Sequence, residues 1–156
     1  MEPITTHNTF VIDHHYPYPP ATLFAAFSEP ARKRRWFADR DGQHAEQFEL
    51  DFRVGGIERV LYRMGPETPF PGVAISTVAT YQDIVPNQRV VFAQTMTLGD
   101  RHITSALVTF EFLPNAAGTD LICTHQGAFY EGSDGPKMRE GGWRRLLDLL
   151  EKSLAG

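Results

Sequence analysis

The sequence predicts an α+β domain in which a curved antiparallel sheet of about seven strands wraps around one long C-terminal helix. From Phe48 onward, apolar residues recur with a period of two, which is typical of strands that bury one face. The C-terminal segment instead repeats its apolar residues at helical spacing. A strand-like segment near the N-terminus, followed by short helical segments, completes the order. We expect residues 1–156 to form a single domain.

The N-terminal segment predicts a strand followed by a short helix. Thr5 to Tyr16 is rich in β-branched and aromatic residues, which favour strands. Pro17, Pro19 and Pro20 end this strand, because proline cannot donate to a ladder of hydrogen bonds. Pro20 also suits the first turn of a helix, which we expect to continue from Ala21 to Phe27.

A second short helix is expected next. Ser28 is its candidate N-cap, Glu29 and Pro30 lie in its first turn, and Trp36-Phe37 mark its end. The basic run over residues 32–35 predicts a solvated helix face, with a nuclear-import or phosphate-binding patch as the alternative.

The central part of the chain predicts the sheet. We expect strands near residues 47–54, 57–63, 73–84, 88–97, 102–113 and 119–129. Breaks rich in glycine, proline or asparagine separate them, and the short connections favour an antiparallel meander. Asp51 and Arg53 share one face of the first of these strands, where we expect a surface or rim ion pair with another strand. Gly55-Gly56 then permits the turn.

The C-terminal segment predicts a helix over residues 136–154. Asp134 is the candidate N-cap, Pro136 fits the first turn, and Arg139 falls among the charged residues between the apolar positions. The helix would span roughly 28 Å, about the width of a six-stranded sheet. Gly141-Gly142 should cost about 2 kcal/mol relative to two alanines. Either the regular helix therefore begins later, or its backbone passes close to another group.

Composition excludes several classes of protein. A net charge of −4 and a pI near 5.8 argue against a nucleic-acid binder and against a surface for anionic membranes. The single cysteine, Cys123, excludes an intrachain disulfide framework and suits a reducing compartment. Residues 1–9 contain no apolar signal core, and no run is long enough to span a membrane. We expect a cytoplasmic protein.

No motif for catalysis or metal binding stands out. His14 and His15 are adjacent, so a strand would point them to opposite faces. The sequence contains no zinc-type, calcium-type or nucleophile-elbow motif. We therefore expect no metal or cofactor, assign no catalytic residue and incline away from an enzyme.

With these elements in order, the chain resembles the START-like SRPBCC superfamily, and within it the family related to the activator of heat-shock protein 90 ATPase. The resemblance covers nearly the whole chain, and the order of elements is that of the helix-grip fold. It rests on Pro20-Ala21 with Phe24 and Phe27, Glu29-Pro30 with Trp36-Phe37, the D-x-R-x-G-G stretch at 51–56, residues 81–86 followed by 89–92, residues 119–127, and Gly142-Trp143 with Leu146, Leu147 and Leu150. The chain departs from the pattern at Phe37, where many relatives have a second tryptophan, and at Gln94, where an aromatic residue is common.

The resemblance implies a cavity, since a curved sheet that grips one helix leaves space at one end. Such pockets are mostly apolar, with a few polar groups that orient the ligand. If the strand phases are right, the inward faces and the helix supply the wall, although core packing is the alternative for each apolar residue. The candidate ligand-binding residues are Trp36, Phe37, Tyr62, Tyr81, Phe92, Gln94, Met96, Ala106, Val108, Cys123, His125, Met138, Trp143 and Leu147.

His125 is the candidate with most chemistry, because its ring would enter an apolar space and need a partner. That partner is a protein group such as Gln94 or else a ligand, and a role as a general acid or base is a third reading.

The leading hypothesis for function is binding of a small hydrophobic or aromatic molecule. The alternatives are a cochaperone that stimulates an ATPase, and a polyketide cyclase-like enzyme in which His125, Tyr81 or Gln94 polarises a carbonyl. Partners other than the ligand, such as a chaperone or a second copy in a homodimer, stay open.

Overall fold

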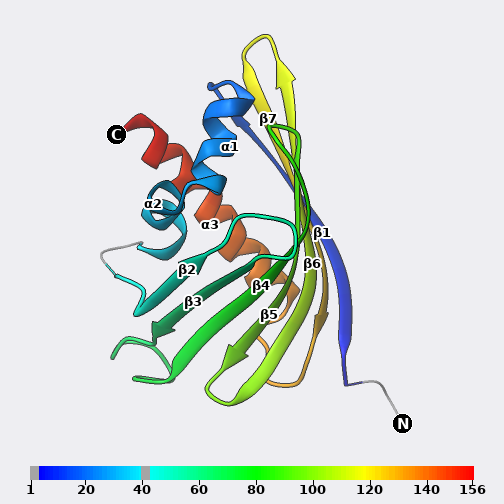
Figure 1. Cartoon of the computed structure of the whole chain (residues 1–156). Coiled ribbons are helices and arrows are strands. Elements are labelled where there is room, and N and C mark those ends of the chain that lie inside the picture. The colour runs from blue at the N-terminus through cyan, green and yellow to red at the C-terminus, as the bar shows by residue number, and fades with distance from the viewer. Residues whose placement is uncertain (1–3, 40–42) are drawn as a thin grey trace.

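The computed structural model describes residues 4–39 and 43–156, and its architecture confirms the α+β helix-grip prediction. One antiparallel sheet curves around the long helix α3 (Figure 1). Its strand order is β1-β7-β6-β5-β4-β3-β2, so neighbouring strands are consecutive in sequence except where β1 closes the sheet against β7. The elements are β1 (Thr6–Tyr16), α1 (Pro20–Ser28), α2 (Pro30–Lys33), η1 (Arg34–Ala38), β2 (Gln47–Leu50), β3 (Ile57–Arg63), β4 (Ala74–Val85), β5 (Arg89–Leu98), β6 (Arg101–Asn115), β7 (Gly118–Phe129) and α3 (Pro136–Ala155).

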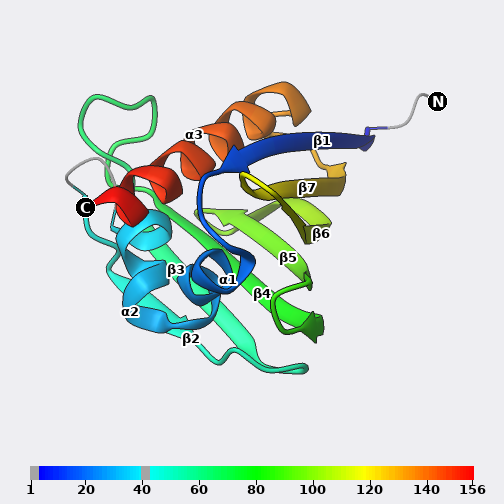
Figure 2. The same ribbon diagram turned by 90° about the horizontal axis from the view of Figure 1, so that it is seen from above.

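The helices all lie on the concave side of the sheet. Seen from above, α3 runs across that face, and α1 and α2 cover the end near the C-terminus of α3 (Figure 2). The bend of the sheet is accompanied by register shifts between Tyr81 and Asp83 and between Met96 and Thr97. Such irregularities increase local twist, which lets the sheet curve around the helix.

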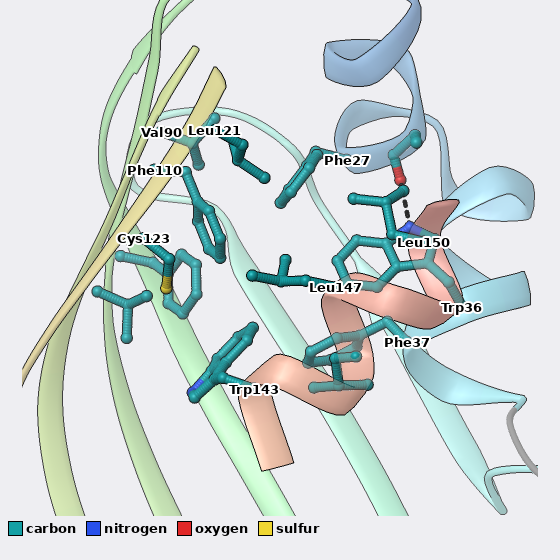
Figure 3. Close-up of a cluster of buried hydrophobic side chains, with 14 of the residues drawn as sticks. Phe27, Trp36, Phe37, Val90, Phe110, Leu121, Cys123, Trp143, Leu147 and Leu150 are labelled. Carbon is teal, nitrogen blue, oxygen red and sulfur yellow. Dashed lines mark hydrogen bonds between the residues drawn. The ribbon is translucent and has the colours of Figure 1, made fainter. Parts of the chain in front are cut away.

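The core is concentrated at one end of this concave face. Phe27 from α1, Trp36 from η1 and Phe110 from β6 meet Leu147 and its neighbours on α3 (Figure 3). Phe27 lies in aromatic contact with both other rings, at centroid distances of 5.1 Å to Trp36 and 4.9 Å to Phe110. The Trp36 indole donates to the carbonyl of Ala26 over 3.0 Å, so its polar atom is satisfied inside the core.

Both predicted N-caps were wrong. Helix α2 has Glu29 rather than Ser28 as its N-cap, and α3 has Gly135 rather than Asp134. Gly135 has a φ of 87°, a conformation that glycine adopts far more readily than aspartate. Neither cap residue forms a side-chain hydrogen bond to its helix. The proline at the first helical position, Pro30 in α2 and Pro136 in α3, therefore favours the start of each helix.

The predicted pairing of Asp51 and Arg53 with another strand was also wrong. Strand β2 ends at Leu50, and the Arg53 guanidinium instead donates to Asp51 over 2.8 Å within the exposed turn.

Neither explanation offered for Gly141-Gly142 holds. Helix α3 is regular from Pro136, and a Cβ built on either glycine would meet no atom within 4 Å. Both positions are exposed, and they leave open space beside the helix.

The basic run 32–35 is not uniformly solvated, which corrects the prediction for one of its residues. Lys33 is buried and forms an ion pair with the buried Glu58 of β3. The Tyr81 hydroxyl donates to the same carboxylate over 2.9 Å. These contacts join α2 to β3 and β4.

Candidate ligand cavity

A cavity of about 750 Å³ lies between the sheet and the N-terminal half of α3. Strands β3 to β6 form its floor, α3 covers it, and the loop between β3 and β4 closes one side. The lining residues are Phe37, Val60, Tyr62, Met64, Pro69, Phe70, Ile75, Thr77, Gln94, Met96, Leu98, Ile103, Gly132, Ser133, Asp134, Met138, Arg139, Gly142, Trp143 and Leu146. Most of these side chains are aliphatic, aromatic or thioether groups.

The mouth of the cavity carries exposed apolar side chains. Phe70, in the loop between β3 and β4, is 51% exposed, and Met138, near the start of α3, is 69% exposed. Both belong to the cavity wall. Apolar surface that remains in contact with water at the entrance of an apolar cavity favours association with an apolar molecule.

A buried arginine forms the polar end of the cavity. Arg139 of α3 is 5% exposed, and its Nε and Nη2 atoms donate to the two carboxylate oxygens of Asp134 over 2.9 and 2.7 Å. Nη2 also donates to Thr104 Oγ1 over 2.8 Å. The third nitrogen, Nη1, is buried and has no acceptor among the described residues.

Two aromatic side chains are fixed on the wall by contacts outside the cavity. The Tyr62 hydroxyl shares its one proton between the backbone carbonyls of Phe37 and Ala38, at 2.7 and 2.8 Å, which ties η1 to β3. Phe37 also lies beneath the Lys33 ammonium, 4.6 Å from its ring centroid. These rings are therefore held in place rather than free to collapse into the cavity.

Comparison with known proteins identifies the family. A family model described as Activator of Hsp90 ATPase homolog 1-like protein matches residues 17–155. The chain belongs to this family. None of the curated proteins matches the sequence of this chain.

Solved structures of bacterial proteins share the fold. An uncharacterised protein from Rhizobium leguminosarum is 36% identical, with a TM-score of 0.91, over 97% of this chain and 96% of its own. The Mll3558 protein from Rhizobium loti is 41% identical, with a TM-score of 0.85, over 96% of this chain and 98% of its own. An AHSA1-like protein from Aeromonas hydrophila, at 19% identity and a TM-score of 0.68 over 95% of this chain and 92% of its own, shows the shared fold alone.

Six of the predicted ligand-binding residues lie on the cavity wall. Their contact with a ligand stays a prediction. These residues are Phe37, Tyr62, Gln94, Met96, Met138 and Trp143. Phe37 and Gln94, the two departures from the family pattern, both lie on the wall.

The other eight predicted residues do not line the cavity. Most of them belong to the packed core or are packed against it, and Tyr81 is engaged with Glu58 there. His125, also buried, stacks on Phe10 with 4.6 Å between ring centroids. These eight are Trp36, Tyr81, Phe92, Ala106, Val108, Cys123, His125 and Leu147.

Arg139 is the main feature of the cavity that sequence reasoning missed. The sequence pattern counted Arg139 among the charged residues between the apolar positions, yet it lies four residues before Trp143 and seven before Leu146, which puts all three on one helix face. That spacing was the available signal.

Within residues 4–39 and 43–156, no group of His, Cys, Asp and Glu side chains could hold a metal ion. No helix of that part is both long and apolar enough to cross a membrane.

Proposed function

We propose that this chain binds a small, mostly apolar molecule in the cavity between the sheet and α3. The observation that carries the proposal is a cavity of about 750 Å³ beside a core that is otherwise filled by aromatic and aliphatic side chains. Ligand pockets in proteins measure roughly 300–1,000 Å³ and are lined mainly by apolar groups. Protein interiors rarely leave such space unfilled, because packing normally excludes it.

The wall favours a ligand with a flat or aromatic body. Phe37 and Trp143 lie 6.2 Å apart between ring centroids on one side, and Tyr62 and Phe70 add further rings. Aromatic faces and edges pack well against a planar apolar molecule. Met96 and Met138 supply flexible side chains that adapt to its outline.

The two adjacent glycines of α3 allow a matched test. A Cβ on Gly142 or on Gly141 would meet open space, but Gly142 belongs to the cavity wall and Gly141 does not. Gly142→Leu should therefore occupy part of the cavity and weaken binding of an apolar ligand by about tenfold or more, since about 1.4 kcal/mol corresponds to each factor of ten. Gly141→Leu should leave binding unchanged.

Screening of the wild-type protein against lipids, polyketides and small aromatics, by thermal shift and native mass spectrometry, would supply the ligand. Its affinity for each variant would then be measured by calorimetry. Both variants should remain folded and gain up to about 1 kcal/mol in stability, because glycine is a poor helix former. A wild-type protein that binds none of these compounds, or a Gly142→Leu variant that binds as well as wild type, would contradict the proposal.

The second candidate, stimulation of a chaperone ATPase, is supported by the description of the family model alone. A coupled ATPase assay with the cognate heat-shock protein 90 would test it, and absence of stimulation would remove it. A cyclase-like reaction has less support, because His125 and Tyr81 lie away from the cavity wall and only Gln94 of the three proposed polarising groups is on it.

A further inference from the structure

One nitrogen of the Arg139 guanidinium forms no hydrogen bond with any described residue. An arginine side chain has five N–H donors in a fixed plane. Nε–H and both Nη2 protons are used by Asp134 and Thr104. The two protons on Nη1 have no acceptor among the described residues, although this atom is buried and Arg139 lines the cavity. Unpaired buried donors are costly, so such a group calls for an acceptor.

The position of the guanidinium is fixed by the elements around it. Thr104 of β6 lies opposite Met96 of β5, and Gln94 lies two residues before Met96 on the same inward face. The Arg139 side chain also lies over the Phe129 ring, 5.4 Å from its centroid. The buried amide of Gln94 is thus a second polar group on the wall of the same cavity.

The charge of this polar end is already balanced. The Arg139 cation is paired in two-point contact with the Asp134 anion. Nearby His125 is neutral, since burial, reinforced by the Arg139 charge, lowers its pKa to about 4. A ligand anion would therefore add an uncompensated charge to an apolar cavity, which costs far more than a neutral polar group.

We propose that the cavity selects apolar molecules that carry a neutral oxygen acceptor, a carbonyl or hydroxyl group, which accepts a hydrogen bond from Arg139 Nη1. This inference rests on the proposed function and names the chemical class of its ligand. The apolar body occupies the space between Phe37, Met96 and Trp143. The oxygen is placed at the end of the cavity where Arg139 and Asp134 lie.

Three probes of one shape test the class of ligand. Acetylnaphthalene has a neutral carbonyl, ethylnaphthalene has the same outline without an acceptor, and naphthoate has an anion. An apolar cavity with no donor would favour ethylnaphthalene, because burying an unpaired carbonyl is unfavourable. In the wild-type protein we expect acetylnaphthalene to bind at least as tightly as ethylnaphthalene, and naphthoate most weakly.

The matched variants are Arg139→Lys and Arg144→Lys. Lysine at 139 keeps a cation for Asp134 but removes Nη1, whereas Arg144 is exposed and paired with Glu140 on the outer side of α3. In Arg139→Lys the affinity ratio of acetylnaphthalene to ethylnaphthalene should fall roughly tenfold, as expected for a lost hydrogen bond to a charged donor. Arg144→Lys should keep the wild-type ratio. Calorimetric titration of each protein with each probe gives these ratios.

The possible results separate this inference from the proposed function. Binding of none of the probes to wild type contradicts both, whereas equal ratios in wild type and Arg139→Lys contradict the role of Arg139 and leave apolar binding intact. Tighter binding of naphthoate than of acetylnaphthalene overturns the neutral class in favour of an anion site. If Arg139→Lys does not fold, the NMR signal of the Arg139 side chain in wild type decides. A shift with acetylnaphthalene but not with ethylnaphthalene supports the inference, and identical spectra overturn it.

Discussion

His125 has a fully buried imidazole whose two nitrogens have no hydrogen-bond partner among the described residues. Its ring lies nearly parallel to Phe10, with 5° between the planes, and packs against Phe129 at 5.8 Å. Gly127 makes this fit possible, because a Cβ there would come within 2.8 Å of His125 Cε1. The residue therefore acts as a flat neutral ring in the sheet, and Gln94, one of the partners considered for it, forms no hydrogen bond with its nitrogens.

This burial makes His125 a source of acid sensitivity. Its pKa is lowered from 6.5 to about 4 in the folded protein, so below pH 6.5 the unfolded chain binds a proton that the folded chain does not. The contribution of His125 to the free energy of unfolding is thus constant above pH 6.5. It falls as the pH is lowered toward 4, by about 3 kcal/mol in total. In His125→Phe this loss should disappear, and stability at neutral pH should be equal or higher because no polar atom is left unpaired.

Urea unfolding of both proteins at several pH values between 7 and 4 measures the difference. His102→Gln, which replaces an exposed histidine of β6, is the control and should keep the wild-type dependence. Parallel curves for wild type and His125→Phe would show that the buried ring does not cause the acid sensitivity.

At the level of elements, the sequence predicted the order of the strands and helices, and most boundaries to within two residues, although β2 ends at Leu50 rather than at residue 54. The alternation of apolar residues placed β3 at its observed bounds, and the helical spacing placed α3 within one residue at its C-terminal end. Both periods follow from backbone geometry, so they are visible in one dimension. The N-caps were missed because they depend on backbone angles, such as the positive φ of Gly135, that composition does not specify.

The Lys33–Glu58 pair shows why charged residues are harder to place than apolar ones. Lys33 lies in a run of four basic residues, yet it shares a helix face with Trp36 and Phe37, three and four positions later. Glu58 lies two residues before the buried Val60 on β3 and shares its inward face. A single sequence does not show that these two charges meet, because their contact depends on how α2 docks on the sheet.

Breaking this pair should be costly. In Lys33→Met the buried Glu58 carboxylate would keep the Tyr81 hydroxyl as its one hydrogen-bond donor among the described residues, and the free energy of unfolding should fall by about 3–5 kcal/mol. The double change Lys33→Met with Glu58→Leu removes both charges and should recover most of that loss. Denaturant unfolding of the single and double variants gives the values.

The exposed Arg53–Asp51 pair provides the comparison. Arg53→Met should cost less than about 1 kcal/mol, since water solvates the remaining carboxylate. A Lys33→Met variant no less stable than Arg53→Met would mean that the buried pair does not anchor α2.

For the whole molecule, the sequence predicted which strand faces point inward but not which end of the concave face is filled. Phe92, Val108 and Cys123 do face inward, and they lie in the packed core. Gln94 and Met96, farther along β5, line the cavity. The division arises because α1 and η1 cover one end of the sheet and bring Phe27 and Trp36 into it. That docking is a property of the three-dimensional arrangement, and no spacing in the chain encodes it.

The two ends of the molecule should therefore differ in local stability. Amides of β6 and β7 around Phe110 and Cys123 lie in central strands over a filled core, and they should exchange with solvent only when the protein unfolds globally. The loop between β3 and β4 and the edge strand β2 have fewer partners and should exchange at least about tenfold faster. Hydrogen exchange followed by mass spectrometry measures both rates.

A ligand in the cavity should slow exchange in the β3–β4 loop and in the first turns of α3. Exchange around Phe110 is already limited by global unfolding, so it should slow only as much as the whole protein is stabilised. Exchange that is uniform along the chain without ligand would show that the filled end and the cavity end are one cooperative unit of equal local stability.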